Sequence, residues 1–153
     1  MRQVAAVAGG VAMLCGVWAL AAAGQVDRTD DEAAVRAAVQ RYMAARASGD
    51  AGAIRAVLTE DADQFTTSGE WRRGREAVVA GTIEASSRNP GDRAIEVEGV
   101  RFPGADVAIA DGPYAIGARR VWTTIVLSRA PDGWRIAAIR NTAPSGPVAP
   151  GTP

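Results

Sequence analysis

The sequence predicts an α+β fold, with helices in the first half of the chain and an antiparallel sheet in the second. Apolar residues recur with the period of a helix before residue 90, and they alternate with polar residues from residue 95 onward. Near the end, Asp132-Gly133 separates two β-rich runs, which is typical of a tight hairpin because glycine accepts a positive φ. Helices and strands segregated in this order are expected to pack as helices on one face of a curved sheet.

The composition excludes several kinds of chemistry. The chain has 153 residues, the size of one domain, and it contains no histidine. All 17 basic side chains are arginine, and the single cysteine, Cys15, lies in an apolar N-terminal run. Histidine bases, lysine Schiff bases and cysteine nucleophiles are therefore excluded after that run, and we expect no metal site and no cofactor. The formal net charge of zero provides no basic surface, so no nucleic-acid partner is expected.

The N-terminal segment has the pattern of a secretory signal peptide. Arg2 precedes an apolar run that ends in Ala21-Ala22-Ala23, which resembles a cleavage site. The run is also about 20 residues long, which is enough to span a bilayer as an uncleaved anchor. Both alternatives place the remainder outside the cytoplasm, secreted or periplasmic, and only the second keeps it on a membrane. The expected parts are a signal peptide or anchor (1–23), a linker (24–28), an α+β domain (29–142) and a disordered proline-rich tail (143–153).

Three helices are predicted before the sheet. Thr29 and Glu32 form a capping box at the start of the first helix, and Gly49 ends it. Asp50 caps a second, shorter helix, and Gly74 opens a third. The apolar positions of the three helices are Val35, Ala38, Val39, Tyr42 and Met43; Ile54, Val57 and Leu58; and Val78, Val79 and Ile83.

A short hairpin and four longer strands complete the expected fold. Residues 59–63 are expected to be a loop that leads into a hairpin before the third helix. Residues 114–116 either continue a strand or start a loop after Gly112-Pro113. The four antiparallel strands are expected around residues 95–97, 107–111, 121–127 and 134–141. A sheet curved around three helices leaves a hollow between the first helix and the concave face.

Three motifs carry a resemblance to a known family. They are residues 69–79, residues 100–102 with 106–108, and residues 133–142, which end in Arg140-Asn141-Thr142. With the order of elements, they resemble the nuclear transport factor 2-like superfamily, in its SnoaL-like branch, and most closely its SgcJ/EcaC-type group. The resemblance implies a cone-shaped fold, frequent homodimers through the sheet, and an apolar pocket inside the cone. Members include isomerases, cyclases, dehydratases and proteins of no known activity, so the fold does not give the function.

The chain departs from this group at one position. Its members often carry a histidine before the final Asn-Thr, where this chain has Arg140. A proton-transfer role assigned to that histidine therefore cannot be carried over.

Asp111 is the candidate catalytic residue. Counting by two from Val107 and Ile109 places it on their face of the strand, which is expected to be the buried one. A carboxylate held there suits a general acid or base. The alternative is that Asp111 starts a turn at Gly112-Pro113 and caps its own backbone.

Six other residues are candidates to line the pocket. Tyr42 lies on the inner helix face, and its hydroxyl needs a partner if buried, whereas core packing is the alternative for Phe65. Arg140 would either hold a ligand oxyanion or pair with an acid such as Asp63 or Asp111. Either face of the last strand could line the pocket mouth. The candidates are Tyr42, Phe65, Trp71, Tyr114, Arg140 and Asn141.

Three functions remain open at this point. The first is an exported domain that binds a small organic ligand in an apolar pocket, without assured catalytic activity. The second is a SnoaL-like enzyme of the isomerase, cyclase or dehydratase type, with Asp111 as base and Tyr42 or Arg140 polarising an oxygen. The third is a non-catalytic dimerisation module that uses the outer sheet face around Trp122.

Overall fold

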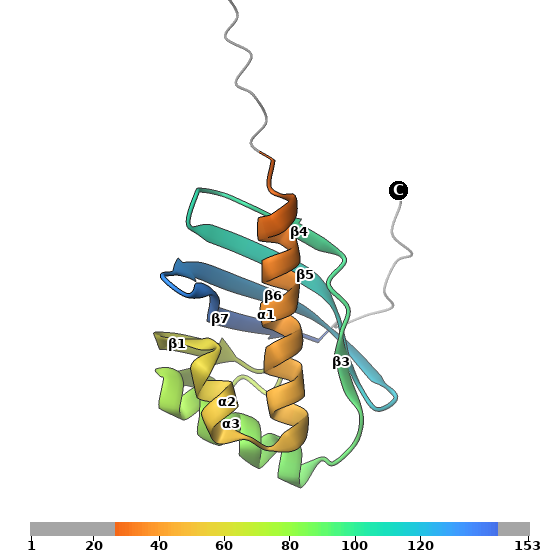
Figure 1. Ribbon diagram of the computed structural model, residues 1–153. Coiled ribbons are helices and arrows are strands. Elements are labelled where there is room, and N and C mark those ends of the chain that lie inside the picture. The colour runs from red at the N-terminus through yellow and green to blue at the C-terminus, as the bar shows by residue number, and fades with distance from the viewer. Residues whose placement is uncertain (1–26, 144–153) are drawn as a thin grey trace, which may run out of the picture.

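The computed structural model describes residues 27–143, which form three helices and a seven-stranded sheet (Figure 1). The helices are α1 (Thr29–Ser48), α2 (Ala51–Ala56) and α3 (Arg75–Arg88). The strands are β1 (Leu58–Phe65), β2 (Trp71–Arg73), β3 (Arg93–Ile95), β4 (Gly99–Arg101), β5 (Val107–Ile116), β6 (Arg119–Ala130) and β7 (Gly133–Thr142). The predicted leader, residues 1–23, and residues 144–153 of the predicted tail lie outside the described residues. Among the helices described, none has the length and apolarity needed to cross a membrane.

The sheet is mixed, in the order β2-β1-β7-β6-β5-β3, and β4 also pairs with β5. The pairing of β1 with β7 is parallel, and the other pairings are antiparallel. The predicted α+β fold with helices on a curved sheet is confirmed, but the expectation of a wholly antiparallel sheet was wrong. The chain leaves β2 through α3 and resumes at the far edge with β3, so β7 arrives beside β1 in the same direction.

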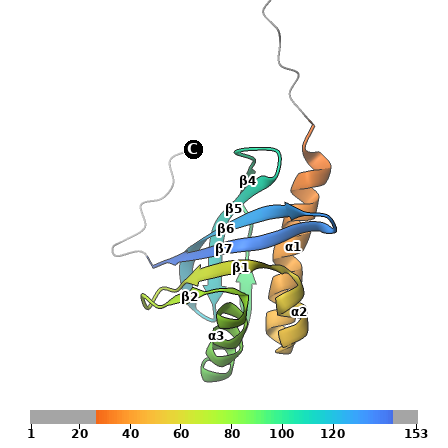
Figure 2. The same ribbon diagram turned by 90° about the vertical axis from the view of Figure 1, so that its left-hand side faces the viewer.

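The helices cover one side of the sheet. Figures 1 and 2 show α1 lying across the sheet, with α2 and α3 at the end where β1 and β2 lie. The apolar face predicted for α1 is buried against β3, β5 and β7, which removes its side chains from water. The largest fully buried apolar side chains are Tyr42, Ile54, Leu58, Ile125, Leu127, Ile136, Ile139, Val35, Val39 and Val78.

The helix ends follow the sequence signals in part. Gly49 takes a φ of 66° after α1, and the Asp50 carboxylate accepts a hydrogen bond of 2.9 Å from the backbone N–H of Ala53, as predicted. The capping box at Thr29 was wrong. Arg28 occupies the cap position without a side-chain cap, and the Thr29 hydroxyl instead donates to the Asp27 carboxylate at 2.6 Å.

The segment expected to be the end of α2 and a loop is strand β1. Leu58, Ala62 and Gln64 are buried, and the strand pairs with β7 from Leu58 to Phe65. The register shifts between Leu58 and Asp63, so the strand is irregular and shows no clean alternation of apolar residues. Pairing with a central strand therefore overrides the local sequence pattern here.

Alternation along β5 is opposite to the predicted one. Ala108, Ala110 and Tyr114 are buried, whereas Val107 is 37% exposed. At Gly112, on the same inward face, the backbone before β4 lies against this strand. A Cβ at Gly112 would overlap the carbonyl of Glu96, whose own N–H donates to Pro113 O at 3.1 Å. The strand also continues through residue 116, which settles the alternative left open there.

Asp31 joins the first turn of α1 to the hairpin of β6 and β7. Its carboxylate accepts hydrogen bonds from Arg28 at 2.8 Å, Arg129 at 2.7 Å and the Trp134 indole at 3.3 Å. The Arg129 guanidinium also lies over the Trp134 ring, 4.4 Å from its centroid. Hydrogen bonds from Arg129 and Arg28 lower the pKa of Asp31 to about 2.

We expect Asp31→Asn to lower the melting temperature at neutral pH by a few degrees. Because the pKa of Asp31 is lower in the folded chain than its ordinary 3.8, the ionised carboxylate stabilises the fold above about pH 4. This contribution is lost as the pH falls toward about 2, so the variant and the original chain should converge there. Thermal unfolding followed by circular dichroism across this range measures the difference. Asp30→Asn, in the same helical turn, is the control, and parallel pH profiles for Asp31→Asn and the original chain would contradict the expectation.

Candidate functional site

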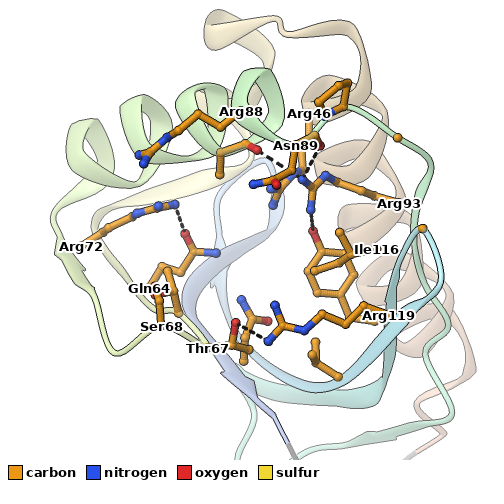
Figure 3. A pocket seen from close by; sticks show the side chains of 18 residues that line it. Arg46, Gln64, Thr67, Ser68, Arg72, Arg88, Asn89, Arg93, Ile116 and Arg119 are labelled. Carbon is orange, nitrogen blue, oxygen red and sulfur yellow. Dashed lines mark hydrogen bonds between the residues drawn. The ribbon is translucent and has the colours of Figure 1, made fainter.

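A cavity of about 620 Å³ lies between the helices and the sheet. It is bounded by the turn between β1 and β2, the segment from the end of α3 to β3, and the turn between β5 and β6 (Figure 3). Its size is that of pockets which hold small organic molecules. The lining includes five arginines and no aspartate or glutamate: Arg46, Arg72, Arg88, Arg93 and Arg119.

Arg46 is the most buried of these arginines, with 6% of its surface exposed. It follows Tyr42 by four residues and so continues the inner face of α1. Its Nε donates to the Ser86 hydroxyl at 3.2 Å, and its guanidinium lies 5.8 Å from the centre of the Tyr114 ring. The side chain thus carries a charge into the interior and is held there by a neutral hydroxyl and an aromatic face.

Arg93 is positioned by the end of α3. Its guanidinium donates to the carbonyls of Ala85 at 3.2 Å and Asn89 at 2.9 Å, at the C-terminal end of the helix. It also donates to the Tyr114 hydroxyl at 3.2 Å. Tyr114 therefore has one arginine at its hydroxyl and another, Arg46, at its ring.

Arg72 is buried, with 7% of its surface exposed, and lies against α3. It donates to Gln64 Oε1 at 2.9 Å and to the Glu70 carboxylate at 2.8 Å, and the first of these bonds is buried. The hydrogen bond from Arg72 lowers the pKa of Glu70. Gly81 makes room for this arrangement, because a Cβ there would overlap the guanidinium of Arg72.

The other two arginines lie nearer to the solvent. Arg119 begins β6 and donates to the Thr67 hydroxyl across the cavity mouth at 3.1 Å. Arg88 ends α3 and pairs with Glu84 at 2.6 Å. Among residues 27–143, no carboxylate forms an ion pair with Arg46, Arg93 or Arg119.

The cavity differs from the apolar pocket expected from the sequence. Its lining is rich in guanidinium groups, and Thr66, Thr67 and Ser68 add hydroxyls from one turn. Apolar surface comes from Tyr114 and its neighbours in the sheet. Such a lining can hold oxyanions by paired hydrogen bonds, but it offers no carboxylate for proton transfer.

Two of the six predicted pocket residues line this cavity, Tyr114 and Asn141. Tyr42 is buried in the core instead, and its hydroxyl lies 3.3 Å from that of Thr82. Phe65 and Trp71 are exposed and pack edge to face, with ring centroids 6.3 Å apart. These three residues do not line the cavity.

Arg140 also lies away from the cavity, where it pairs with Asp63. Both carboxylate oxygens of Asp63 lie 2.9 Å from the Arg140 guanidinium, so the structural pairing considered from the sequence is confirmed. The reason is a bulge in β7, where Val126 pairs with Ala138 but Leu127 pairs with Ile136. The extra residue reverses the alternation, and Asn141 rather than Arg140 then faces inward.

Asp111 does not face the interior, which corrects the expected placement. It shares the outer face of β5 with Val107, accepts a hydrogen bond from Thr124 at 2.6 Å and lies 3.5 Å from the exposed Arg101. It does not line the cavity. Among residues 27–143, no group of three or more metal-ligating side chains is gathered.

The sequence analysis missed all five of the cavity arginines. A usable signal existed for one of them, because Arg46 falls on the apolar face of α1 where a charge is out of place. Arg72, Arg93 and Arg119 carried no such signal, since each lies beside a turn and resembles an ordinary solvated side chain.

Comparison with solved structures identifies the class of fold. A domain of unknown function with a cystatin-like fold from Nostoc punctiforme is 25% identical, covers 78% of this chain and 80% of its own, and has a TM-score of 0.67. A nuclear transport factor 2-like protein from Novosphingobium aromaticivorans is 20% identical over 78% and 85%, with a TM-score of 0.61. A ketosteroid isomerase-like protein from Erwinia carotovora atroseptica is 20% identical over 77% and 99%, with a TM-score of 0.60. The chain therefore has the nuclear transport factor 2-like fold, as predicted.

The family follows from the sequence match. Residues 30–139 match the model of the putative lumazine-binding family, and the chain belongs to that family. No curated protein matches it. The SgcJ/EcaC-type group named from the motifs stays a prediction.

The packing of the Arg72 guanidinium against Gly81 can be tested by a double-mutant cycle. Alanine in place of a helical glycine ordinarily raises the free energy of unfolding by about 1 kcal/mol. We expect this gain from Gly81→Ala in the Arg72→Ala background, where the space is free. In the original chain the new methyl group displaces the guanidinium from Gln64, and the gain should be cancelled or reversed. Urea denaturation measures all four proteins, and an equal effect of Gly81→Ala in both backgrounds would exclude the contact.

Proposed function

We propose that this chain is a binding protein for a small organic anion, which it holds in the arginine-lined cavity. The observation that carries the proposal is that Arg46, Arg93 and Arg119 line one cavity without an ion-pair partner among the described residues. Their hydrogen bonds go to hydroxyl and carbonyl oxygens, which orient a guanidinium but do not neutralise it. An oxyanion would supply the missing charge.

The burial of Arg46 strengthens this argument. A charge removed from water without a counter-charge destabilises a fold, and natural chains keep one chiefly where function requires it. Arginine also suits the role better than lysine, because its planar fork binds carboxylate and phosphate oxygens in pairs. The cavity is thus arranged to gain its compensating charge on binding.

The family name supports a planar ring as part of the ligand. Lumazine is a flat heterocycle with carbonyl oxygens, and the family that this chain belongs to is described as putatively lumazine-binding. Tyr114 and Ile116 offer the cavity a flat apolar surface beside the arginines. Binding of a ring that carries an anionic group agrees with both observations.

Binding is favoured over the enzyme alternative by the location of the carboxylates. A base for proton abstraction must reach the substrate, and Asp111 lies on the opposite face of the sheet from the cavity lining. The similarity to a ketosteroid isomerase-like protein is a similarity of fold.

Arg46→Met separates binding from stability. Because the substitution removes a buried charge that lacks a counter-charge, we expect the ligand-free variant to melt at the same temperature as the original chain or higher. Benzoate at ten times its dissociation constant should stabilise the original chain by about 1.4 kcal/mol. The variant should lose this response. Thermal unfolding of the full-length chain with and without benzoate measures both effects.

The control for this experiment is Arg101→Met. Arg101 is 64% exposed and lies on the outer side, where it pairs with Asp111. Its loss should leave the benzoate response unchanged. A full response in Arg46→Met, or none in the original chain with benzoate or any other organic anion, would contradict the proposed function.

We also propose that the chain forms a homodimer through the outer face of the sheet. Trp71, Trp122 and Phe65 are 53%, 43% and 40% exposed, which is unusual for large aromatic side chains. Trp122 alternates with the buried Val121 and Thr123, so it points away from the helices.

Trp122→Glu should convert a dimer to a monomer, because a charge at the centre of an apolar interface is left unpaired. Sedimentation velocity of the full-length chain measures the change. Gln40→Glu introduces the same charge on the solvent face of α1 and should leave the mass unchanged. A monomeric original chain would refute the dimer.

A further inference from the structure

The free arginines of the cavity form two separate groups. Arg46 and Arg93 meet at Tyr114, one at its ring and one at its hydroxyl. Arg119 stands apart from them beside Thr67, on the other side of the cavity in Figure 3. The cavity therefore has two positive ends rather than one convergent centre.

The remaining arginines do not change this division. Arg72 is paired with Glu70 at 2.8 Å, and Arg88 with Glu84 at 2.6 Å. Their charges are already compensated by neighbouring carboxylates, whereas Arg46, Arg93 and Arg119 have no such partner in the part of the chain that the structure describes.

The sheet sets the spacing between the two ends. Arg93 pairs with Ile116, and Ile116 pairs with Arg119, so the two arginines lie at the same register on strands either side of Ile116. Because neighbouring strands lie about 5 Å apart, the backbones of Arg93 and Arg119 are about 10 Å apart. The surface between the ends is formed by Tyr114, Ile116 and Val121, which are apolar apart from the tyrosine hydroxyl.

We propose that the ligand is an organic dianion whose two anionic groups lie at opposite ends of a flat apolar spacer, as in an aromatic dicarboxylate. One group binds Arg46 and Arg93, the other binds Arg119 and the Thr67 hydroxyl, and the spacer lies on Tyr114 and Ile116. This inference rests on the proposed function, because it assigns the charge and shape of the ligand in the same cavity.

Terephthalate and benzoate test the inference, since they share one ring and differ by one carboxylate at the far end. Isothermal titration with the full-length chain should give terephthalate a dissociation constant about tenfold lower than that of benzoate. Arg119→Gln should weaken terephthalate about tenfold and weaken benzoate by less. Arg93→Gln should weaken both ligands.

A third ligand tests whether the cavity prefers two separate anionic groups or one group that carries both charges. Phenyl phosphate carries its two charges on one group, and it should bind more weakly than terephthalate. Tighter binding of phenyl phosphate would overturn the two-ended site. Equal affinities of benzoate and terephthalate, or an equal loss of both in Arg119→Gln, would also overturn it.

These failures differ from failure of the proposed function. In each of them at least one organic anion still binds in the cavity, so the anion-binding function stands. Arg135→Gln, which removes a half-buried arginine paired with Asp132 outside the cavity, is the matched control and should leave all three affinities unchanged.

Discussion

The position of β7 at the centre of the sheet decides most of the structure. It pairs with β1 in parallel on one side and with β6 in antiparallel fashion on the other, so it joins the N-terminal hairpin to the long C-terminal strands. Its bulge divides the strand in two. Before the bulge, Trp134 and Ile136 face the core, and after it Ile139 and Asn141 do. A regular strand would have turned Arg140 inward and left Asp63 without its partner.

The cavity depends on how the interior holds its arginines. Arg46 comes from the inner face of α1, and Arg93 is fixed by the carbonyls at the end of α3. Both reach Tyr114 from different elements, so the packing of α1 and α3 on the sheet determines their spacing. The position of Arg72 depends on packing in the same way. Because Gly81 has no side chain, the Arg72 guanidinium occupies the space where a Cβ would lie. The buried charges lower the free energy of unfolding, and the apolar core between α1 and the sheet offsets this loss.

The sequence predicted the elements better than their directions. The caps at Gly49 and Asp50 follow from local chemistry, and the alternation in β6 correctly placed Trp122 on the outside. Asp111 was misplaced because β5 buries alanines and glycine, not its larger aliphatic residues, so hydrophobicity alone gave the wrong face. The bulge of β7 leaves no local signal. Both errors concern which face of a strand the rest of the chain packs against. The sequence of the strand alone does not determine that face.

The formal net charge of zero gave no indication of the arginine-lined cavity. Equal numbers of acidic and basic residues indicated no basic surface for nucleic acid, but net charge reports on the whole surface and not on one cavity. The charge of the cavity depends instead on where the acidic and basic side chains lie within the fold. Carboxylates such as Asp31, Asp63 and Glu76 pair with arginines outside the cavity, whereas Arg46, Arg93 and Arg119 inside it have no carboxylate partner among residues 27–143. A hollow between helices and sheet does not by itself decide what binds there. The side chains that line it decide this, and in this chain their charge favours an anion.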